Sequence, residues 1–262
     1  MGDELQHHLR IRVGDVGRYV FLPGDPQRSE LIAGHFEDPH QVAANREYNT
    51  WSGFLDGELV SVTSTGIGCP SATIAVEELT KVGVKTVIRV GTAGAMQPDI
   101  KPGELGVVTA AIRDEGTTAH YMPLAFPAVA DLDVTMALIA GARATGVEPR
   151  IGISQSKDSF YGQHEPARMP VAKQLEERWN AWTAGGAICS EMECAAIYIV
   201  GSILRLRSGG IMRIAGHSDQ TPMTEAERAE AQDIEPVIRA AIAGLRQLIA
   251  ADRARDLQIA AS

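Results

Sequence analysis

Arg89 is a permanent cation near the end of an apolar run, within the segment VIRVGTAGAMQP at residues 87–98. The apolar residues around it predict a buried strand, and GTAG predicts the turn that follows. A buried arginine needs an anion or a carboxylate as its partner. Gly91 and Thr92 place a small turn and a hydroxyl directly after the arginine, which suits a tetrahedral oxyanion. A salt bridge from Arg89 to a carboxylate is the alternative interpretation.

Two glycine turns elsewhere in the chain could also bind an anion. In LPGDPQR at residues 22–28, the Gly24 amide can approach a ligand closely and Arg28 can fork onto its oxygens. In TSTGIGCPSATIAVEEL at residues 63–79, a glycine turn precedes a helical pattern whose N-terminus can bind phosphate. This turn matches a dinucleotide fingerprint only in part, because Ser71 occupies the third glycine position. A solvated arginine and an ordinary helix start are the structural alternatives.

Carboxylates gather in EMECAA, where Glu191 and Glu193 flank Met192 before an apolar helix. Either glutamate can accept hydrogen bonds from the vicinal diol of a ribose. The structural alternatives are an acidic residue that complements the helix dipole and a methionine that fills the core.

A possible proton donor follows the apolar strand that ends in AGHSDQ. His217, Ser218 and Asp219 stand directly after it, where a strand end meets a loop. Such a position suits a general acid. A helix N-cap before TEAERAE is the alternative role for Asp219.

The elements that must position these residues alternate between short apolar runs and helical patterns. This alternation predicts one α/β domain over residues 1–262 around a mixed sheet, with the site where strands end in loops. The expected strands lie within residues 18–24, 58–68, 85–94, 103–112, 149–160 and 209–219. The expected helices lie within residues 70–84, 132–146, 191–206 and 224–254, the last with a break near Pro236.

Composition narrows the class of protein. The 33 acidic residues outnumber the 24 basic ones and no basic stripe is present, so we expect no nucleic-acid partner. Cys69, Cys189 and Cys194 lack paired spacing, which favours reduced thiols in a cytoplasmic protein over disulfides or a zinc site. The polar start MGDELQHH does not have the pattern of a signal peptide, and no apolar run is long enough to suggest a membrane helix.

Taken together, these motifs resemble the uridine phosphorylase branch of the nucleoside phosphorylase family. The match runs in order over most of the chain, through PGDPQR, NREYNTW, STGIGCPS, IRVGTAGAMQP, SFYGQHE and EMECA. The resemblance implies a single α/β domain with a mixed, partly closed sheet. It also implies cleavage of a nucleoside by inorganic phosphate, which gives ribose 1-phosphate and the free base.

The resemblance assigns the predicted residues to parts of the substrate. It implies phosphate binding by Gly24, Arg28, Arg89 and Thr92, with Arg46 supplied by a neighbouring subunit. It implies ribose binding by Met192, Glu193 and the neighbour's His8, although a histidine this close to the chain end can equally be disordered. It implies that Phe160 and Gln163 contact the base, and that Glu47, Ile67 and Ser71 hold a monovalent cation, with potassium the candidate, between subunits.

The base-recognition segment departs from the family pattern. Uridine phosphorylases usually have an arginine two residues after the base-reading glutamine, but here Glu165 follows Gln163. The loop also lacks the proline expected between Tyr161 and Gly162. A carboxylate at the base would repel the acceptor oxygens of uracil. Asp219, which follows Ser218, instead resembles the general acid of the related purine nucleoside phosphorylases.

We therefore expect a pentosyltransferase most like uridine phosphorylase, with a purine nucleoside phosphorylase that uses Asp219 as the main alternative. A nucleosidase is a weaker alternative, because nucleosidases of this superfamily lack the full set that Arg28, Arg46 and Arg89 form here. A non-catalytic nucleoside-binding protein is the last alternative function. We expect no cofactor beyond phosphate as co-substrate, no membrane partner, a role in nucleoside salvage, and a homohexamer whose sites are shared between two subunits.

Overall fold

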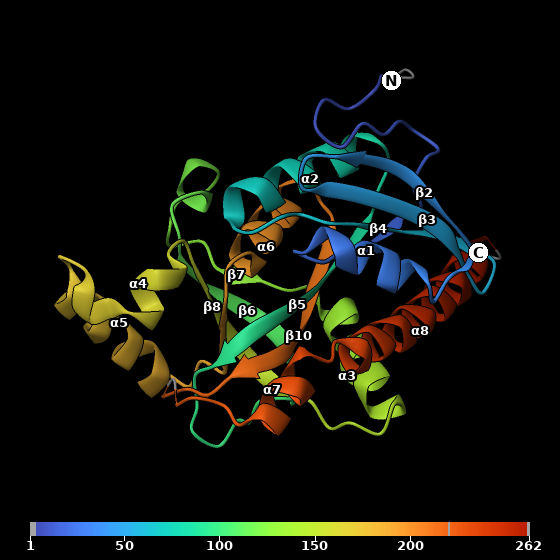
Figure 1. The fold of residues 1–262 in the computed structure, drawn as a ribbon. Coiled ribbons are helices and arrows are strands. Elements are labelled where there is room, and N and C mark those ends of the chain that lie inside the picture. Colours follow the sequence, from blue (N-terminus) through green and yellow to red (C-terminus); the bar gives the residue numbers. More distant parts are fainter. Residues whose placement is uncertain (1–3, 220, 261–262) are drawn as a thin grey trace.

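The computed structural model describes residues 4–219 and 221–260, and all ten strands of this part join one mixed sheet (Figure 1). Because β10 pairs with both β5 and β6, the strands β10, β6, β8, β9 and β5 close into a ring. The sheet then continues from β5 through β1, β4, β3 and β2, while β7 pairs with β6. The strands are β1 (Tyr19–Leu22), β2 (Glu37–Asn45), β3 (Tyr48–Leu55), β4 (Glu58–Thr63), β5 (Thr86–Ala95), β6 (Leu105–Asp114), β7 (Ala128–Val129), β8 (Arg150–Lys157), β9 (Cys189–Glu191) and β10 (Arg207–Gly216).

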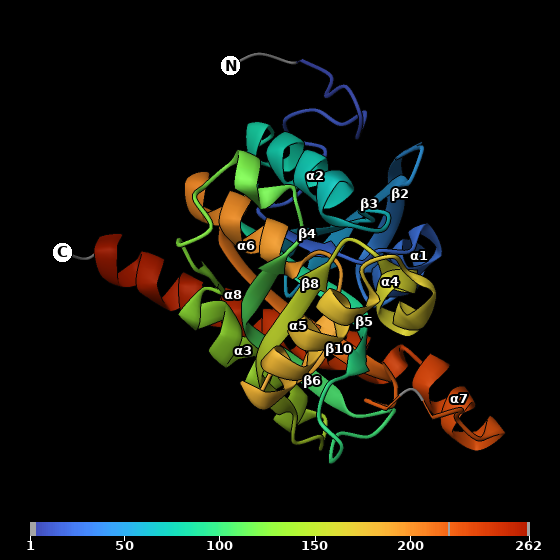
Figure 2. The same ribbon diagram turned by 90° about the vertical axis from the view of Figure 1, so that its left-hand side faces the viewer.

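Helices cover both faces of this sheet. Apolar residues of α2 and α6 pack in one core cluster, and those of α1, α3 and α8 pack in the other. Figure 2 shows α5 in front of β6 and β8, with α4 to its right near β5. The helices are α1 (Pro26–Ala33), α2 (Cys69–Lys81), α3 (Leu132–Ala144), α4 (Phe160–His164), α5 (Ala172–Ala184), α6 (Cys194–Ile203), α7 (Glu225–Gln232) and α8 (Glu235–Ala260).

The predicted α/β class and the partly closed mixed sheet are confirmed, as are all six expected strands. One expected helix needs correction, and the break expected near Pro236 in another is confirmed. The helix expected over residues 191–206 begins only at Cys194, because residues 189–191 pair with β5 and β8 as strand β9. The helix expected over residues 224–254 is two helices, and Pro236 lies in the first turn of the second, where its missing N–H costs nothing.

The short elements α1, α4, β7 and β9 were not predicted, and neither were three longer ones without a clear apolar pattern. Strand β2 at the sheet edge is mostly exposed and contains Pro39, which is tolerated only at such edges. Its partner β3 and the helix α5 were also missed, and none of the residues of α5 is buried. In the described part of the chain, no helix is both long and apolar enough to cross a membrane.

Candidate active site

Gly24, Arg28, Arg89 and Thr92, which the sequence assigns to one anion, line a single cavity of about 780 Å³. They come from three elements whose ends meet there, because β1 and β5 run parallel side by side and α1 follows β1. The cap of α1 fixes the turn between them: Asp25 accepts a hydrogen bond from the amide of Gln27 at 2.9 Å.

The two cations of this cavity repel each other. Burial lowers the pKa of Arg28, the neighbouring Arg89 lowers it further, and Asp25 acts in the opposite direction. An anion bound between the two guanidinium groups would relieve this repulsion. The pair is therefore a suitable binding site for a phosphate dianion.

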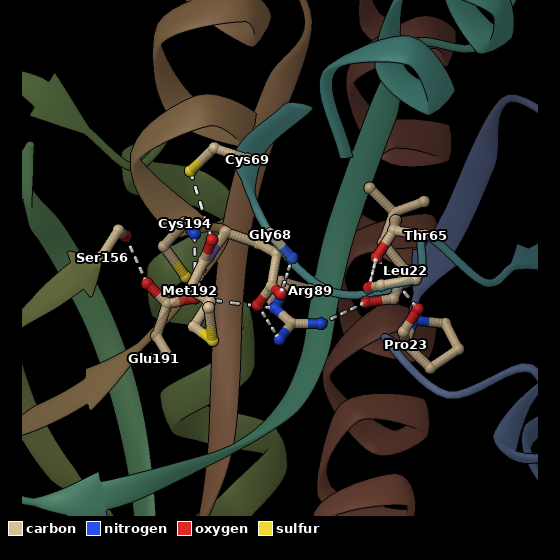
Figure 3. Close-up of polar contacts among 12 residues, drawn as sticks. Leu22, Pro23, Thr65, Gly68, Cys69, Arg89, Ser156, Glu191, Met192 and Cys194 are labelled. Carbon is tan, nitrogen blue, oxygen red and sulfur yellow. Dashed lines mark hydrogen bonds and ion pairs between the residues drawn. The ribbon is translucent and has the colours of Figure 1, made fainter. Parts of the chain in front are cut away.

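Arg89 is 4% exposed and already has a carboxylate partner (Figure 3). Its Nη2 forms an ion pair with Oε2 of Glu193, and its Nε lies 3.7 Å from Oε2 of Glu191. Burial alone would lower the pKa of Arg89, but the two glutamates more than offset that effect and raise it. The carboxylate interpretation is therefore confirmed, while anion binding by Arg89, which also lines the cavity, stays a prediction.

Gly91 gives the Arg89 side chain its room. A Cβ atom at residue 91 would lie 2.8 Å from Sδ of Met212 and 3.0 Å from Cζ of Arg89. Neither contact is tolerable without displacement of the neighbour. The expected GTAG turn is wrong, because residues 91–94 continue strand β5 and pair with its neighbours. Gly91 leaves the space that the Arg89 and Met212 side chains occupy.

The structure separates the two glutamates that the sequence left equivalent. Glu191 accepts hydrogen bonds from Ser156 Oγ and from the amides of Glu193 and Cys194, the latter two at 2.7 and 2.9 Å. It therefore stabilises the start of α6. Glu193 accepts from the Gly68 amide at 2.6 Å and holds Arg89, with its carboxylate beside Met192 at the cavity wall. Burial raises the pKa of Glu193, and Arg89 acts against this shift.

The expected base-contacting residues divide between two cavities. Phe160 lines the cavity that contains Arg89, and its ring lies 4.2 Å from that of His164. Gln163 lines an adjoining cavity of about 600 Å³, where its Oε1 accepts from Ser190 Oγ at 2.8 Å. His164 had not been singled out from the sequence.

Glu165 and Asp219 line neither cavity. Glu165 is turned outward and forms an ion pair with Arg168 at 2.8 Å. Asp219 is exposed, its carboxylate accepts from the Thr221 amide at 3.0 Å, and hydrogen bonds to Thr221 lower its pKa. A general acid needs the opposite shift. The N-cap of α7 is Thr224, so Asp219 does not have that role either.

His8 and Arg46, the two residues expected to serve a neighbouring subunit, do not line the cavity of their own chain. They lie close together, because the Asn45 side chain donates to the His8 carbonyl at 2.7 Å and Arg46 is the next residue. Arg46 is exposed in the turn between β2 and β3, and the His8 ring contacts Glu78 at 2.7 Å.

The expected cation-binding residues lie beside one another. Ser71 Oγ is 2.8 Å from Oε1 of Glu47 and also contacts the Thr65 carbonyl oxygen. Ile67, the third expected residue, is 77% exposed. Carboxylate, hydroxyl and carbonyl oxygens are suitable ligands for an alkali cation.

Comparison with known proteins identifies the family. A family model described as Phosphorylase superfamily matches residues 18–251. The chain is 47% identical to the uridine phosphorylase of Treponema pallidum, over 96% of this chain and 97% of that protein. It is also 38% identical to the guanosine phosphorylase of Halorubrum lacusprofundi, over 81% and 83%. A crystal structure of uridine phosphorylase from Vibrio fischeri superposes with a TM-score of 0.82 and 32% identity, over 93% of this chain and 96% of that one.

Proposed function

We propose, because the chain belongs to the phosphorylase superfamily, that it is a nucleoside phosphorylase most like uridine phosphorylase. The observation that carries this function is the cavity in which two arginines and a buried carboxylate meet. The arginines suit phosphate and the carboxylate suits the hydroxyls of a ribose.

The reaction follows from this arrangement. A phosphate oxygen attacks C1′ of the nucleoside while the bond between C1′ and the base nitrogen breaks, and its electron pair leaves with the base. Positive charge develops on the sugar, so a phosphate dianion held below it by Arg28 and Arg89 both attacks and stabilises. Glu193 orients the ribose by accepting hydrogen bonds from the ribose hydroxyls. The ion pair between Glu193 and Arg89 fixes the position of the ribose-binding group relative to the phosphate-binding group.

Uridine is the proposed substrate. The Treponema relative is named a uridine phosphorylase, and the outward position and lowered pKa of Asp219 do not favour a purine N7 donor. The Halorubrum relative, named a guanosine phosphorylase, supports purine cleavage as the second candidate. The nature of the base is thus the part of the proposal that most needs measurement.

The assembly is part of the same proposal. A homohexamer built from dimers would let Arg46 and His8 reach a neighbour's cavity, which agrees with their position away from their own. Potassium between Glu47, Ile67 and Ser71 is proposed for the interface. The free, buried thiols of Cys69, Cys189 and Cys194 agree with a cytoplasmic salvage enzyme. One domain over residues 1–262 stays a prediction.

A substrate panel tests the function. Uridine, thymidine, inosine, adenosine and guanosine are incubated with the protein, each with and without phosphate, and the free base is measured. Uridine cleavage that requires phosphate is expected. Cleavage without phosphate would indicate a nucleosidase, inosine or guanosine cleavage a purine enzyme, and binding without cleavage a nucleoside-binding protein.

A further inference from the structure

Lys157 is a buried cation that the phosphate and ribose contacts leave without a role. It ends strand β8 and is only 6% exposed. Lysine is rarely buried unless it is paired or functional. Lys157 lines both the cavity with Arg89 and the cavity with Gln163, so the two cavities adjoin at this residue.

A hydrogen-bonded chain connects Lys157 to the expected base-reading glutamine. The Lys157 ammonium donates to Ser190 Oγ at 2.8 Å, and Ser190 Oγ lies 2.8 Å from Oε1 of Gln163. It also lies 2.7 Å from Oε1 of Gln155. Since a serine has one proton, Ser190 can donate to only one of these amides at a time.

The other cations near Gln163 already have partners. Arg178 forms an ion pair with Asp114 at 2.9 Å, and Arg113 donates to the backbone carbonyls of the loop after β6. Glu165 is turned toward Arg168 and brings no positive charge to the base. Lys157 is therefore the best placed of the described cations to replace the arginine that the resemblance leads one to expect.

The charges around Lys157 set its ionisation. Burial lowers its pKa, and Glu191 and Glu193, then Cys189 and Asp114, act in the opposite direction. Burial also lowers the pKa of His164, and the positive charge of Lys157 lowers it further. The pKa of Lys157 is lowered overall, because burial outweighs the carboxylates, and the hydrogen bond to Ser190 is the contact that orients its amino group.

We propose that Lys157 binds a carbonyl oxygen of the departing base and balances the negative charge that develops there. The inference rests on the proposed phosphorylase activity and specifies its substrate class. As the bond from C1′ to the base nitrogen breaks, the electron pair spreads onto the ring and its carbonyl oxygens. An ammonium has only donors, so it selects a carbonyl and rejects an exocyclic amine at the same place. The position in question is ring carbon C4, where uridine and thymidine carry a carbonyl and fit this requirement, whereas cytidine carries an amine and does not.

Leaving-group dependence tests the proposal. Lys157→Met is assayed with phosphate on uridine and on 5-fluorouridine, whose base carries negative charge more readily because fluorine withdraws electrons. We expect kcat on uridine to fall by roughly a hundredfold, kcat on 5-fluorouridine to fall distinctly less, and the KM for phosphate to stay unchanged. Equal losses on both nucleosides would overturn the proposal, since a purely structural lysine would affect both alike. Lys173→Met is the control, because Lys173 is exposed on α5.

A second variant keeps the test decisive if Lys157→Met does not fold. Lys157→Gln places an amide there that can also accept a hydrogen bond from an exocyclic amine. The ratio of kcat/KM for uridine to that for cytidine should fall at least tenfold, and an unchanged ratio would overturn the proposal. Failure of the proposed function is distinct, because the parent protein would then cleave no nucleoside with phosphate.

Discussion

At the scale of single residues, the Arg89–Glu193 ion pair joins groups that are proposed to bind different parts of the substrate. Both side chains are almost fully buried, at 4% and 3% exposure. A buried pair of this kind contributes little net stability, because desolvation offsets its attraction. The ion pair instead holds both side chains in position, since each group fixes the other before the substrate binds.

Arg89→Ala is expected to damage both catalysis and folding. Loss of a charge-assisted phosphate contact should lower kcat/KM by about a hundredfold or more, equivalent to about 3 kcal/mol. The variant also leaves Glu193 buried without its cation, which should cost about 3–5 kcal/mol of unfolding free energy. Phosphate-dependent kinetics and urea unfolding measure the two effects. Arg143→Ala, which removes an exposed partner of Glu148, is the control.

Phosphate-dependent cleavage by Arg89→Ala at the parent rate would refute the assigned role of this arginine.

Asp219→Asn is expected to change neither uridine nor inosine cleavage by more than about twofold, because exposed turn residues have small effects. The aspartate is exposed and its lowered pKa keeps it ionised at neutral pH, so it has no proton to donate. Initial rates on both nucleosides are the measurement. A selective loss of inosine cleavage would identify Asp219 as the acid of a purine enzyme.

At the scale of elements, Asp252 connects helix α8 to the sheet through side-chain hydrogen bonds. It accepts hydrogen bonds from Tyr19 of β1 at 2.6 Å and from Arg207 of β10 at 2.9 Å. Burial alone would raise the pKa of Asp252, but the hydrogen bonds from Arg207 and Tyr19 outweigh it and lower the pKa. The carboxylate thus stabilises the folded state only while it is ionised.

The contribution of Asp252 should depend on pH. Because its pKa is lower in the folded state than in the unfolded one, the unfolded chain binds the proton more readily at low pH. The stabilisation is therefore present above about pH 4, the ordinary value for aspartate, and is lost as the pH falls through the folded pKa. Asp252→Asn should lower the unfolding free energy by about 1–3 kcal/mol at pH 7, with a difference that shrinks below pH 4.

Urea unfolding between pH 3 and 8 measures this difference. Asp256→Asn serves as the matched control on the same helix, because Asp256 is 63% exposed and lies 3.6 Å from Arg18. A loss in Asp252→Asn that is the same at every pH would contradict the ionised-state explanation.

At the scale of the whole molecule, the residues expected to form one site do not all line the same cavity of a single chain. Arg28, Arg89 and Glu193 line the cavity, whereas His8 and Arg46 are not among its lining residues. A second copy of the chain that brings this pair to the cavity would complete the proposed set of phosphate and ribose ligands.

Mixing two inactive variants tests the shared site. Arg46→Ala and Glu193→Ala are each expected to be inactive alone. In a mixed dimer, one of the two sites keeps both side chains, so some phosphate-dependent cleavage should return after subunit exchange. Absence of rescue, with exchange demonstrated by differently tagged subunits, would mean that each site is built from one chain.

Local sequence was enough to predict the α/β class and six strands, and the four residues expected to bind phosphate do line one cavity, although phosphate binding there stays a prediction. Gly24, Arg28, Arg89 and Thr92 stand at the ends of apolar runs or directly after them, and the ends of parallel neighbouring strands meet at one edge of a sheet. Strand β2 and helix α5 escaped prediction, because mostly exposed elements show no apolar periodicity.

Only the tertiary structure decided which polar groups face one another. Glu191 and Glu193 are equivalent in the sequence, but in the structure Glu191, the last residue of β9, accepts from the first amides of α6, whereas Glu193 forms the closer ion pair with Arg89. Lys157 lies 33 residues before Ser190, and the pairing of β8 with β9 brings them into contact. Contacts of this kind depend on strand register and side-chain direction, which residues distant in the sequence determine jointly and no local pattern records.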